Sequence, residues 1–145
     1  MNTTKIWRLA LTMLAAFSLA SCSIDGPDEP DGKWPSMVWK AEIPVEMTDG
    51  TYNVPATGAE LTFACQNYSF PWVENALSNG EYYYPPREAN DYKTITTDWF
   101  RAEINGNILK VVFEANETAE ERLLLLEVTA GDIFYTFKFK QSANK

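Results

Sequence analysis

The chain has 145 residues, and its 20 Asp and Glu outnumber its 12 Lys and Arg, which gives a formal net charge of −8. This length fits one small globular domain and excludes a multidomain enzyme. The sequence contains no His, which excludes Ser-His-Asp and Cys-His hydrolases and zinc sites built on imidazole. The excess of acidic residues gives the chain no electrostatic means of holding phosphate backbones, so nucleic acid is not an expected partner.

The N-terminal residues have the pattern of a bacterial lipoprotein leader. Lys5 and Arg8 precede an apolar run over residues 9–20, which is typical of a secretory signal peptide and too short to cross a bilayer as a helix. The run leads into Leu-Ala-Ser-Cys ending at Cys22, which resembles a lipobox, where the nucleophilic cysteine thiolate accepts the lipid. We predict a signal peptide over residues 1–21 and a lipid on Cys22 that attaches the protein to the outer membrane. The lipid-anchored protein faces either the periplasm or the cell surface; the alternative is an unmodified cysteine beside an ordinary cleavage site.

A segment rich in Pro and acidic residues follows the cysteine. Residues 25–31 hold four acidic residues and two prolines, and such a segment cannot bury enough apolar surface to order itself. We predict a tether over residues 22–40 and one domain over residues 41–145. The acidic stretch also resembles the export signal of surface-exposed Bacteroidetes lipoproteins, with a plain spacer as the alternative. Trp34 and Trp39 are expected either to dock on the domain or to lie near the membrane interface.

Short runs that alternate between apolar and polar residues predict β-strands over the rest of the chain. The expected strands cover residues 42–47, 60–66, 99–104, 108–115, 123–130 and 133–141. The turn residues at 105–107 and 131–132 predict that the last four of these strands form two hairpins. The composition of residues 117–126 suits a helix, but the alternation that continues through Thr129 favours a turn and then a strand. We therefore predict an all-β fold, an immunoglobulin-like antiparallel β-sandwich of about seven to eight strands.

Cys65 is expected in the core of this sandwich. Leu61, Phe63 and Cys65 share one face of their predicted strand. With Cys22 lipidated, Cys65 has no partner for an internal disulfide, and no basic residue stands near it in sequence to lower the pKa of its thiol. A buried thiol is therefore favoured over a reactive one.

The second half of the domain resembles a known family. Trp72 and Trp99 precede a strand that begins after Gly106, and the pattern ends with a last strand that closes in Gln141. Between these strands lie Asn116-x-Thr118 and Arg122. This pattern resembles the BACON domain, the Bacteroidetes-associated carbohydrate-binding, often N-terminal domain, over residues 42–141. The resemblance implies an immunoglobulin-like sandwich with a carbohydrate ligand.

Four residues of this pattern are interpreted as structural. They are Asn116, Thr118, Arg122 and Gln141. Asn116 and Thr118 can cap a tight turn through bonds from side chain to backbone, and Arg122 can tie that turn to a neighbouring strand. The alternative, a direct contact with a ligand, is the less common use of these side chains.

The candidate ligand-binding residues lie mainly in an insertion between the two tryptophans. Sugars stack their apolar face on aromatic rings while polar groups bind their hydroxyls. The candidates are Tyr82, Tyr83, Tyr84, Arg87, Tyr92, Trp72 and Trp99. In an extended segment Tyr83 faces opposite to Tyr82 and Tyr84, so at least one ring is expected to be exposed or covered by its own loop. The favoured interpretation is that the loop packs its rings over one end of the sandwich and that both tryptophans lie in the core, with a ligand site as the alternative.

These observations favour a noncatalytic, lipid-anchored envelope protein that binds a glycan or a glycoprotein, with no cofactor and no metal. The alternative is a structural or protein-interaction subunit of a cell-envelope complex. An enzyme would need paired carboxylates at a defined separation. Glu81, Glu88 and Asp91 form the only acidic cluster beside aromatic residues, and no calcium-binding loop has a recognisable spacing.

Overall fold

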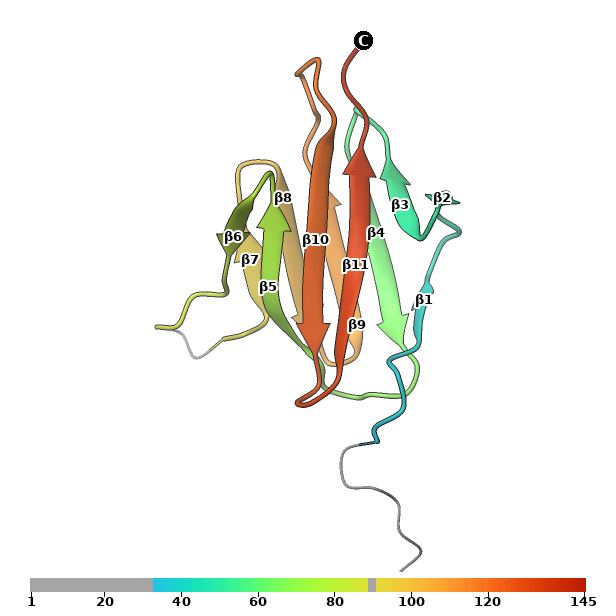
Figure 1. Cartoon of the computed structure of the whole chain (residues 1–145), viewed down its shortest axis with the longest axis vertical. Helices are drawn as coiled ribbons and strands as arrows, with labels where there is room; N and C mark the ends of the chain where they lie inside the picture. The colour runs from blue at the N-terminus through green and yellow to red at the C-terminus, as the bar shows by residue number, and fades with distance from the viewer. Residues whose placement is uncertain (1–32, 89–90) are drawn as a thin grey trace, which may run out of the picture. The chain divides into compact units, whose positions relative to one another are not determined.

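The structure, a computed structural model, describes residues 33–88 and 91–145 (Figure 1). The predicted signal peptide, the lipidation site at Cys22 and most of the tether lie outside the described residues. Trp34–Lys145 forms one compact unit. In its described part this unit is all-β, with eleven strands. A search of the described residues finds no helix with the length and hydropathy needed to span a bilayer.

The strands form two sheets that pack face to face (Figure 1). Sheet A has the order β1 (Trp39–Ala41), β4 (Ala59–Cys65), β9 (Ile108–Phe113), β8 (Phe100–Asn105), β7 (Thr94–Thr96). Sheet B has the order β2 (Met47–Thr48), β3 (Thr51–Val54), β11 (Phe134–Gln141), β10 (Arg122–Thr129), β5 (Trp72–Ser78), β6 (Glu81–Tyr83). All pairs are antiparallel except β3 with β11. The predicted immunoglobulin-like antiparallel β-sandwich is confirmed, with more strands than expected.

The two predicted hairpins are present. β8 pairs with β9 around a turn in which Gly106 has a φ of 58°, a left-handed conformation that glycine adopts without strain. β10 pairs with β11 in continuous register from Arg122 to Thr129. Residues 122–129 are therefore strand rather than helix, because sheet pairing overrides their local helix propensity.

The core lies between the sheets and is rich in aromatic rings. Phe137 lies 4.9 Å from Phe63 and Phe139 lies 5.2 Å from Phe113, measured between ring centroids. Fully burying one such side chain contributes roughly 1.5–3 kcal/mol. Cys65 is buried in this core, as predicted.

Two local features of the backbone shape the sandwich. Gly58 has a φ of 86°, and a Cβ there would overlap the carbonyl oxygen of Phe113, so only glycine lets the turn before β4 approach β9. In β5, Asn75 pairs with Glu127 and Val73 pairs with Val128. Glu74 is therefore an extra residue, a β-bulge in the middle of the strand.

The domain begins earlier than the predicted boundary at Ala41. Met37 is buried in the core, and Trp39 begins β1 and packs its ring 5.1 Å from Phe137. Trp39 therefore docks on the domain. The acidic run ends at Asp31 and residues 34–39 are mostly apolar, so the composition already changes before the predicted boundary.

The predicted strand over residues 42–47 is wrong. This segment carries the chain from sheet A to sheet B, between β1 and β2. It contains Pro44, which lacks the N–H that continuous pairing needs, and only Glu42 N and Glu46 O make backbone bonds to β4 and β3. Apolar and polar residues still alternate here, but the segment bonds to β4 at its start and to β3 at its end.

Candidate functional site

Side chains on the outer face of sheet B form a row across four strands. Tyr82 of β6 pairs with Leu77 of β5, Leu77 pairs with Leu125 of β10, and Leu125 pairs with Lys138 of β11. Directly paired residues point to the same side of a sheet, so these four side chains stand next to one another. We call Tyr82, Tyr84, Leu77, Leu123 and Leu125 the tyrosine face.

Two exposed tyrosines stand at the edge of this face. Tyr82 and Tyr84 are 57% and 62% exposed, and their rings lie 6.2 Å apart with an angle of 19° between their planes. Tyr83 faces the other way, as predicted, and its ring meets Phe100 edge-on at 6.2 Å. Its hydroxyl donates to the Glu81 carboxylate at 3.0 Å, and this bond raises the pKa of Tyr83 above its ordinary value. Two of the three predicted tyrosines are therefore available to a ligand, and the third supports the strand.

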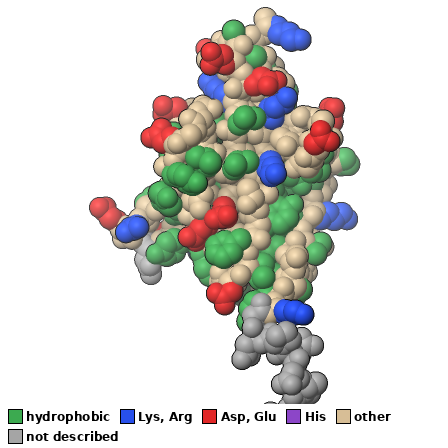
Figure 2. Space-filling model, viewed as in Figure 1, with side chains coloured by type: hydrophobic (Ala, Val, Ile, Leu, Met, Phe, Trp, Pro, Cys, Tyr) green, Lys and Arg blue, Asp and Glu red, His purple; other side chains and the backbone are tan. Residues whose placement is uncertain are grey.

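A shallow hollow of about 350 Å³ is lined by Leu77, the residue paired with Tyr82, and neither Tyr82 nor Tyr84 is part of its lining. Its apolar lining comes from the leucines of the tyrosine face, and its polar lining includes Lys138, Asn79 and Thr51. Figure 2, viewed as in Figure 1, shows hydrophobic side chains gathered over β5, β6 and β10. The volume lies within the range of small-molecule sites, and a mostly apolar wall with a few polar groups is typical of them.

A second aromatic surface lies at one end of the sandwich. Phe70 is 79% exposed, Trp72 is half-buried and Tyr92 is exposed. These rings line a hollow of about 400 Å³ together with Lys93 and Asn105. The connection between β4 and β5 and the turn between β8 and β9 meet here, and we call this surface the Phe70 end.

A polar row separates the two aromatic surfaces. Asn75 pairs with Glu127 on the outer face of sheet B, and the Asn75 amide donates to the Glu127 carboxylate at 3.0 Å. Trp72 pairs with Thr129 on one side of this row, and Leu77 pairs with Leu125 on the other. Figure 2 shows acidic side chains between the two hydrophobic patches. The predicted candidates Trp72 and Tyr92 are therefore not part of the same site as Tyr82 and Tyr84.

Trp99 lies at the opposite end of the molecule from Phe70 and has a structural role. Its ring packs edge-on against Phe100 at 5.1 Å, and the Arg122 guanidinium lies 5.4 Å from its centroid. A cation held over a ring in this way stabilises the contact. Trp99 is therefore covered on one face by Arg122 and does not belong to the candidate site. Arg87 lies exposed in the connection after β6.

Asn116 and Thr118 form the predicted turn cap. Asn116 is buried, and its amide donates to the backbone oxygens of Glu120 and Ser142 at 2.8 and 2.9 Å. Its side-chain oxygen accepts from the Thr118 hydroxyl at 2.7 Å and from the Thr118 N–H. The side-chain amide of Gln141 donates to the Glu114 backbone oxygen at 2.7 Å, which ties the end of β11 to the end of β9. These residues hold the two sheets together.

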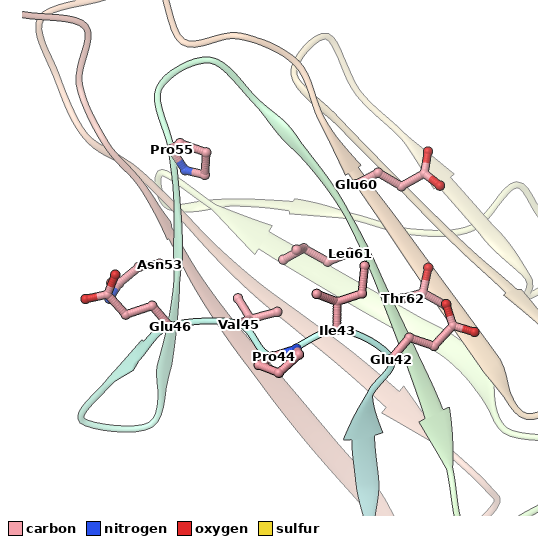
Figure 3. A pocket seen from close by; sticks show the side chains of 10 residues that line it. All are labelled: Glu42, Ile43, Pro44, Val45, Glu46, Asn53, Pro55, Glu60, Leu61 and Thr62. Carbon is pink, nitrogen blue, oxygen red and sulfur yellow. The ribbon is translucent and has the colours of Figure 1, made fainter.

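A third hollow, of about 360 Å³, lies where the chain crosses between the sheets (Figure 3). Figure 3 shows that its lining includes Ile43 and Leu61 together with three carboxylates, Glu42, Glu46 and Glu60. The lining contains no aromatic ring, so it lacks the surface on which a sugar would stack. Among the described residues, no three Cys, Asp or Glu side chains converge in a way that could hold a metal ion.

Four residues of the two surfaces were not predicted as functional candidates: Phe70, Leu77, Leu123 and Leu125. Leu123 and Leu125 carried a signal, because they occupy the outward positions of a strand whose inward positions are also leucine. A half-buried strand normally alternates apolar with polar residues. Leu77 and Phe70 carried no comparable signal, since their orientation depends on the bulge at Glu74 and on the path of the β4–β5 connection.

The geometry defines an all-β protein with an immunoglobulin-like sandwich that carries two exposed aromatic surfaces. An NMR structure of a protein from Bacteroides thetaiotaomicron is 32% identical in sequence, with a TM-score of 0.68. The similarity covers 83% of this chain and 98% of that chain. The chain belongs to the same family as that Bacteroides thetaiotaomicron protein. Titin M4 in its trigonal form is 7% identical over 77% of this chain and 100% of that chain, with a TM-score of 0.44. No family model and no curated protein matches the chain.

Proposed function

We propose that this protein is a noncatalytic, lipid-anchored glycan or glycoprotein binding module of the bacterial cell envelope. Its contact surface in this proposal is the tyrosine face. The observation that carries the proposal is the pair of exposed, nearly parallel rings of Tyr82 and Tyr84 beside an apolar hollow. An exposed aromatic pair that continues into a row of leucines is a contiguous apolar patch, and such patches mark binding surfaces.

The chemistry of this surface suits a sugar. The apolar face of a pyranose stacks on a tyrosine ring, and the phenolic hydroxyls of Tyr82 and Tyr84 are available to its hydroxyl groups. Lys138 and Asn79 line the adjoining hollow and supply an ammonium and an amide as further hydrogen-bond donors. The resemblance of residues 42–141 to the BACON domain supports a carbohydrate as the ligand.

The anchor in this proposal is a lipid on Cys22. It is supported by the basic start, the apolar run and the small residues that precede Cys22 in the sequence. Several acyl chains on one cysteine give stable attachment to a membrane, whereas a single chain gives only marginal binding. We propose attachment to the outer membrane, with the domain on the periplasmic side or at the cell surface.

A glycan array tests the proposal, followed by titration calorimetry on the glycans that bind. The probe is the full chain, purified in detergent after processing. Replacing Tyr82 and Tyr84 by Ala is expected to weaken binding by about two- to tenfold for each ring, because each stacking contact is worth roughly 0.5–1.5 kcal/mol. Tyr92→Ala is the matched control, since it removes an exposed ring from the other surface. A chain that binds no glycan, or that loses binding equally with Tyr92→Ala, would contradict the proposal.

One observation favours a second function, a protein-interaction subunit of an envelope complex. Leu123 and Leu125 are exposed beside the tyrosines, and burial of aliphatic side chains is typical of protein interfaces. Leu123→Asp with Leu125→Asp would abolish binding to a protein partner, because it places unpaired charges in the interface. For a sugar, loss of Tyr82 and Tyr84 is expected to cost more binding than loss of Leu123 and Leu125, and for a protein partner the reverse is expected, so the two functions are distinguishable.

A further inference from the structure

Four large exposed apolar side chains occupy the Phe70 end and its immediate surroundings. Phe70 and Tyr92 line its hollow. Trp34 is 57% exposed, and Phe134 is also exposed. Thr129 of β10 pairs with Phe134 of β11 on one side and with Trp72 of β5 on the other. Such a group of aromatic rings on one end of a small domain is unusual for a surface that meets only water. Trp and Tyr are the residues that membrane interfaces favour, because their rings are apolar while their N–H and O–H groups stay hydrated.

The chain enters the domain at this same end. The Tyr68 hydroxyl donates to the Pro35 backbone oxygen at 2.6 Å. The Asn67 side chain donates to the Ser36 oxygen at 2.8 Å and accepts from the Val38 N–H at 2.9 Å. Asn67 and Tyr68 belong to the β4–β5 connection that also carries Phe70. Figure 1 shows residues 34–38 at the end of the sandwich where this connection runs.

The length of chain before Trp34 limits how far this end can move from the lipid. Cys22 precedes Trp34 by 12 residues. A chain of that length spans about 40 Å when fully extended and averages about 20 Å when flexible. A lipid on Cys22 would therefore keep the Phe70 end closer to the bilayer than the opposite end of the sandwich.

The distribution of charge favours the same orientation. The connection between β9 and β10, at the opposite end, carries exposed Glu114, Glu117, Glu120 and Glu121. Lys140 pairs with Glu121 at 3.3 Å, and Lys145 and Arg122 are the other cations of that end. At the Phe70 end of the described domain, Lys33 and Lys93 offset Asp91 and Asp132, while Glu127 lies one residue row further from this end. An anionic bilayer repels the acidic end, where β9 and β10 are joined, more strongly than it repels the Phe70 end.

We propose that the Phe70 end of the sandwich docks on the phospholipid bilayer that holds the anchor. The rings of Phe70 and Trp34 enter the headgroup region, with Trp72, Tyr92 and Phe134 around them. This inference rests on the lipid anchor of the proposed function, but it is independent of the ligand of the tyrosine face.

Quenching of tryptophan fluorescence by brominated lipids tests this docking. The full chain, processed and lipidated, is reconstituted in vesicles of phosphatidylethanolamine and phosphatidylglycerol, either with or without bromine on the acyl chains. Flotation of the vesicles measures attachment, and emission measures contact. The brominated lipid is expected to quench the wild type, and Trp34→Phe is expected to remove a large part of that quenching. Trp99→Phe, at the far end, is the matched control and is expected to retain it.

Phe70→Ser sharpens the test, because it removes one ring without touching a fluorophore. Loss of a buried phenyl group is expected to shift the ratio of docked to undocked molecules by about tenfold or more, with a matching fall in quenching. Phe134→Ser is the second variant, and the near-ultraviolet circular dichroism of both variants reports whether the core is intact.

The outcomes separate the two proposals. A chain that floats with the vesicles but shows the same emission in brominated and ordinary lipid overturns the docking and leaves the anchor standing. Folded Phe70→Ser and Phe134→Ser variants that are quenched like the wild type also overturn it. A chain that does not float overturns both the anchor and the docking. Glycan binding through Tyr82 and Tyr84 is measured separately in detergent, so its failure is distinguishable from each of these.

Discussion

The two outer faces of this sandwich are built over one core but differ in chemistry. On sheet A, Lys110 pairs with Glu60 at 2.8 Å and Arg101 pairs with Glu103 at 2.9 Å, and all four side chains are well exposed. On sheet B, the corresponding outward positions hold Leu77, Leu125 and their neighbours. Both sheets need apolar residues only on their inner sides.

This difference indicates which face has a role beyond folding. Exposed ion pairs contribute at most about 1 kcal/mol each and mainly keep a surface hydrated. Exposed leucines and tyrosines in a row contribute little to the fold and create a risk of aggregation. The presence of such a row on sheet B, opposite the charged outer face of sheet A, supports the proposal that the row is a contact surface.

The largest predicted effect is a loss of stability that affects both sheets, because they share one core. Phe137 packs against Phe63 and Trp39, which belong to sheet A, from its own place in sheet B. Phe137→Ala is expected to lower the free energy of unfolding by about 3–5 kcal/mol, because it leaves a cavity in the shared core. Urea denaturation measures the change. A loss of less than about 1 kcal/mol would show that the faces do not depend on one core.

A smaller effect is expected where the chain passes from sheet A to sheet B. Asn116→Ala removes the buried side chain whose amide donates to the backbone oxygens of Glu120 and Ser142. This substitution is expected to cost about 1–3 kcal/mol of unfolding free energy in a urea titration. The neighbouring Glu117→Ala is exposed and is expected to change stability by less than about 0.5 kcal/mol. Equal losses in the two variants would mean that the turn cap has no structural role.

The comparison of the faces can be sharpened with an apolar dye. Leu125→Asn on sheet B is expected to weaken binding of anilinonaphthalene sulfonate by about tenfold, because it removes an exposed leucine from the hollow. Val112→Asn on sheet A is the matched change and is expected to leave dye binding unaltered. Fluorescence titration of the folded variants measures both. An equal loss of dye binding in Leu125→Asn and Val112→Asn would show that the two outer faces do not differ in their affinity for the dye.

The smallest effect is a loss of stability at alkaline pH. Burial raises the pKa of Tyr52 above its ordinary value of 10.0, and the bond to Glu81 raises that of Tyr83. Each group holds its proton more tightly in the folded state, so the contribution to stability is complete below pH 10 and is lost as pH rises through the raised pKa. Chemical denaturation at a series of pH values measures the decline, and Tyr52→Phe is expected to reduce it. Stability that rises above pH 10 would contradict this sign.

The sequence predicted the parts of the fold that local chemistry determines. The hairpins around Gly106 and Gly131 follow from turn residues flanked by alternating strands. The parallel pairing of β3 with β11 and the crossing between sheets at residues 42–46 join segments far apart in the chain. No local pattern encodes these contacts. Met37 and Trp39 were assigned to the tether for the same reason, since Trp39 packs against the distant Phe137 and Met37 joins the same core.

The candidate site was predicted in part. Tyr82 and Tyr84 were identified because alternation in an extended segment must expose one side of a run of three tyrosines. The division of the candidates into two surfaces was not predictable, because it depends on the register of β5 against β10. Trp99 is a tryptophan like Trp72, but it lies beneath Arg122. This contact joins residues far apart in the chain, so no local sequence pattern predicts it.

The bulge at Glu74 has a consequence for both surfaces. Trp72 and Leu77 are five positions apart, so in an uninterrupted strand they would point to opposite sides of the sheet. The extra residue shifts the phase of β5, and both side chains then face outward while Val73 and Ala76 stay inside. A single unpaired residue thus lets one strand present Trp72 at the Phe70 end and Leu77 on the tyrosine face. Deletion of Glu74 would remove the unpaired residue and leave Trp72 and Leu77 four positions apart, so both side chains would still face outward in a regular strand.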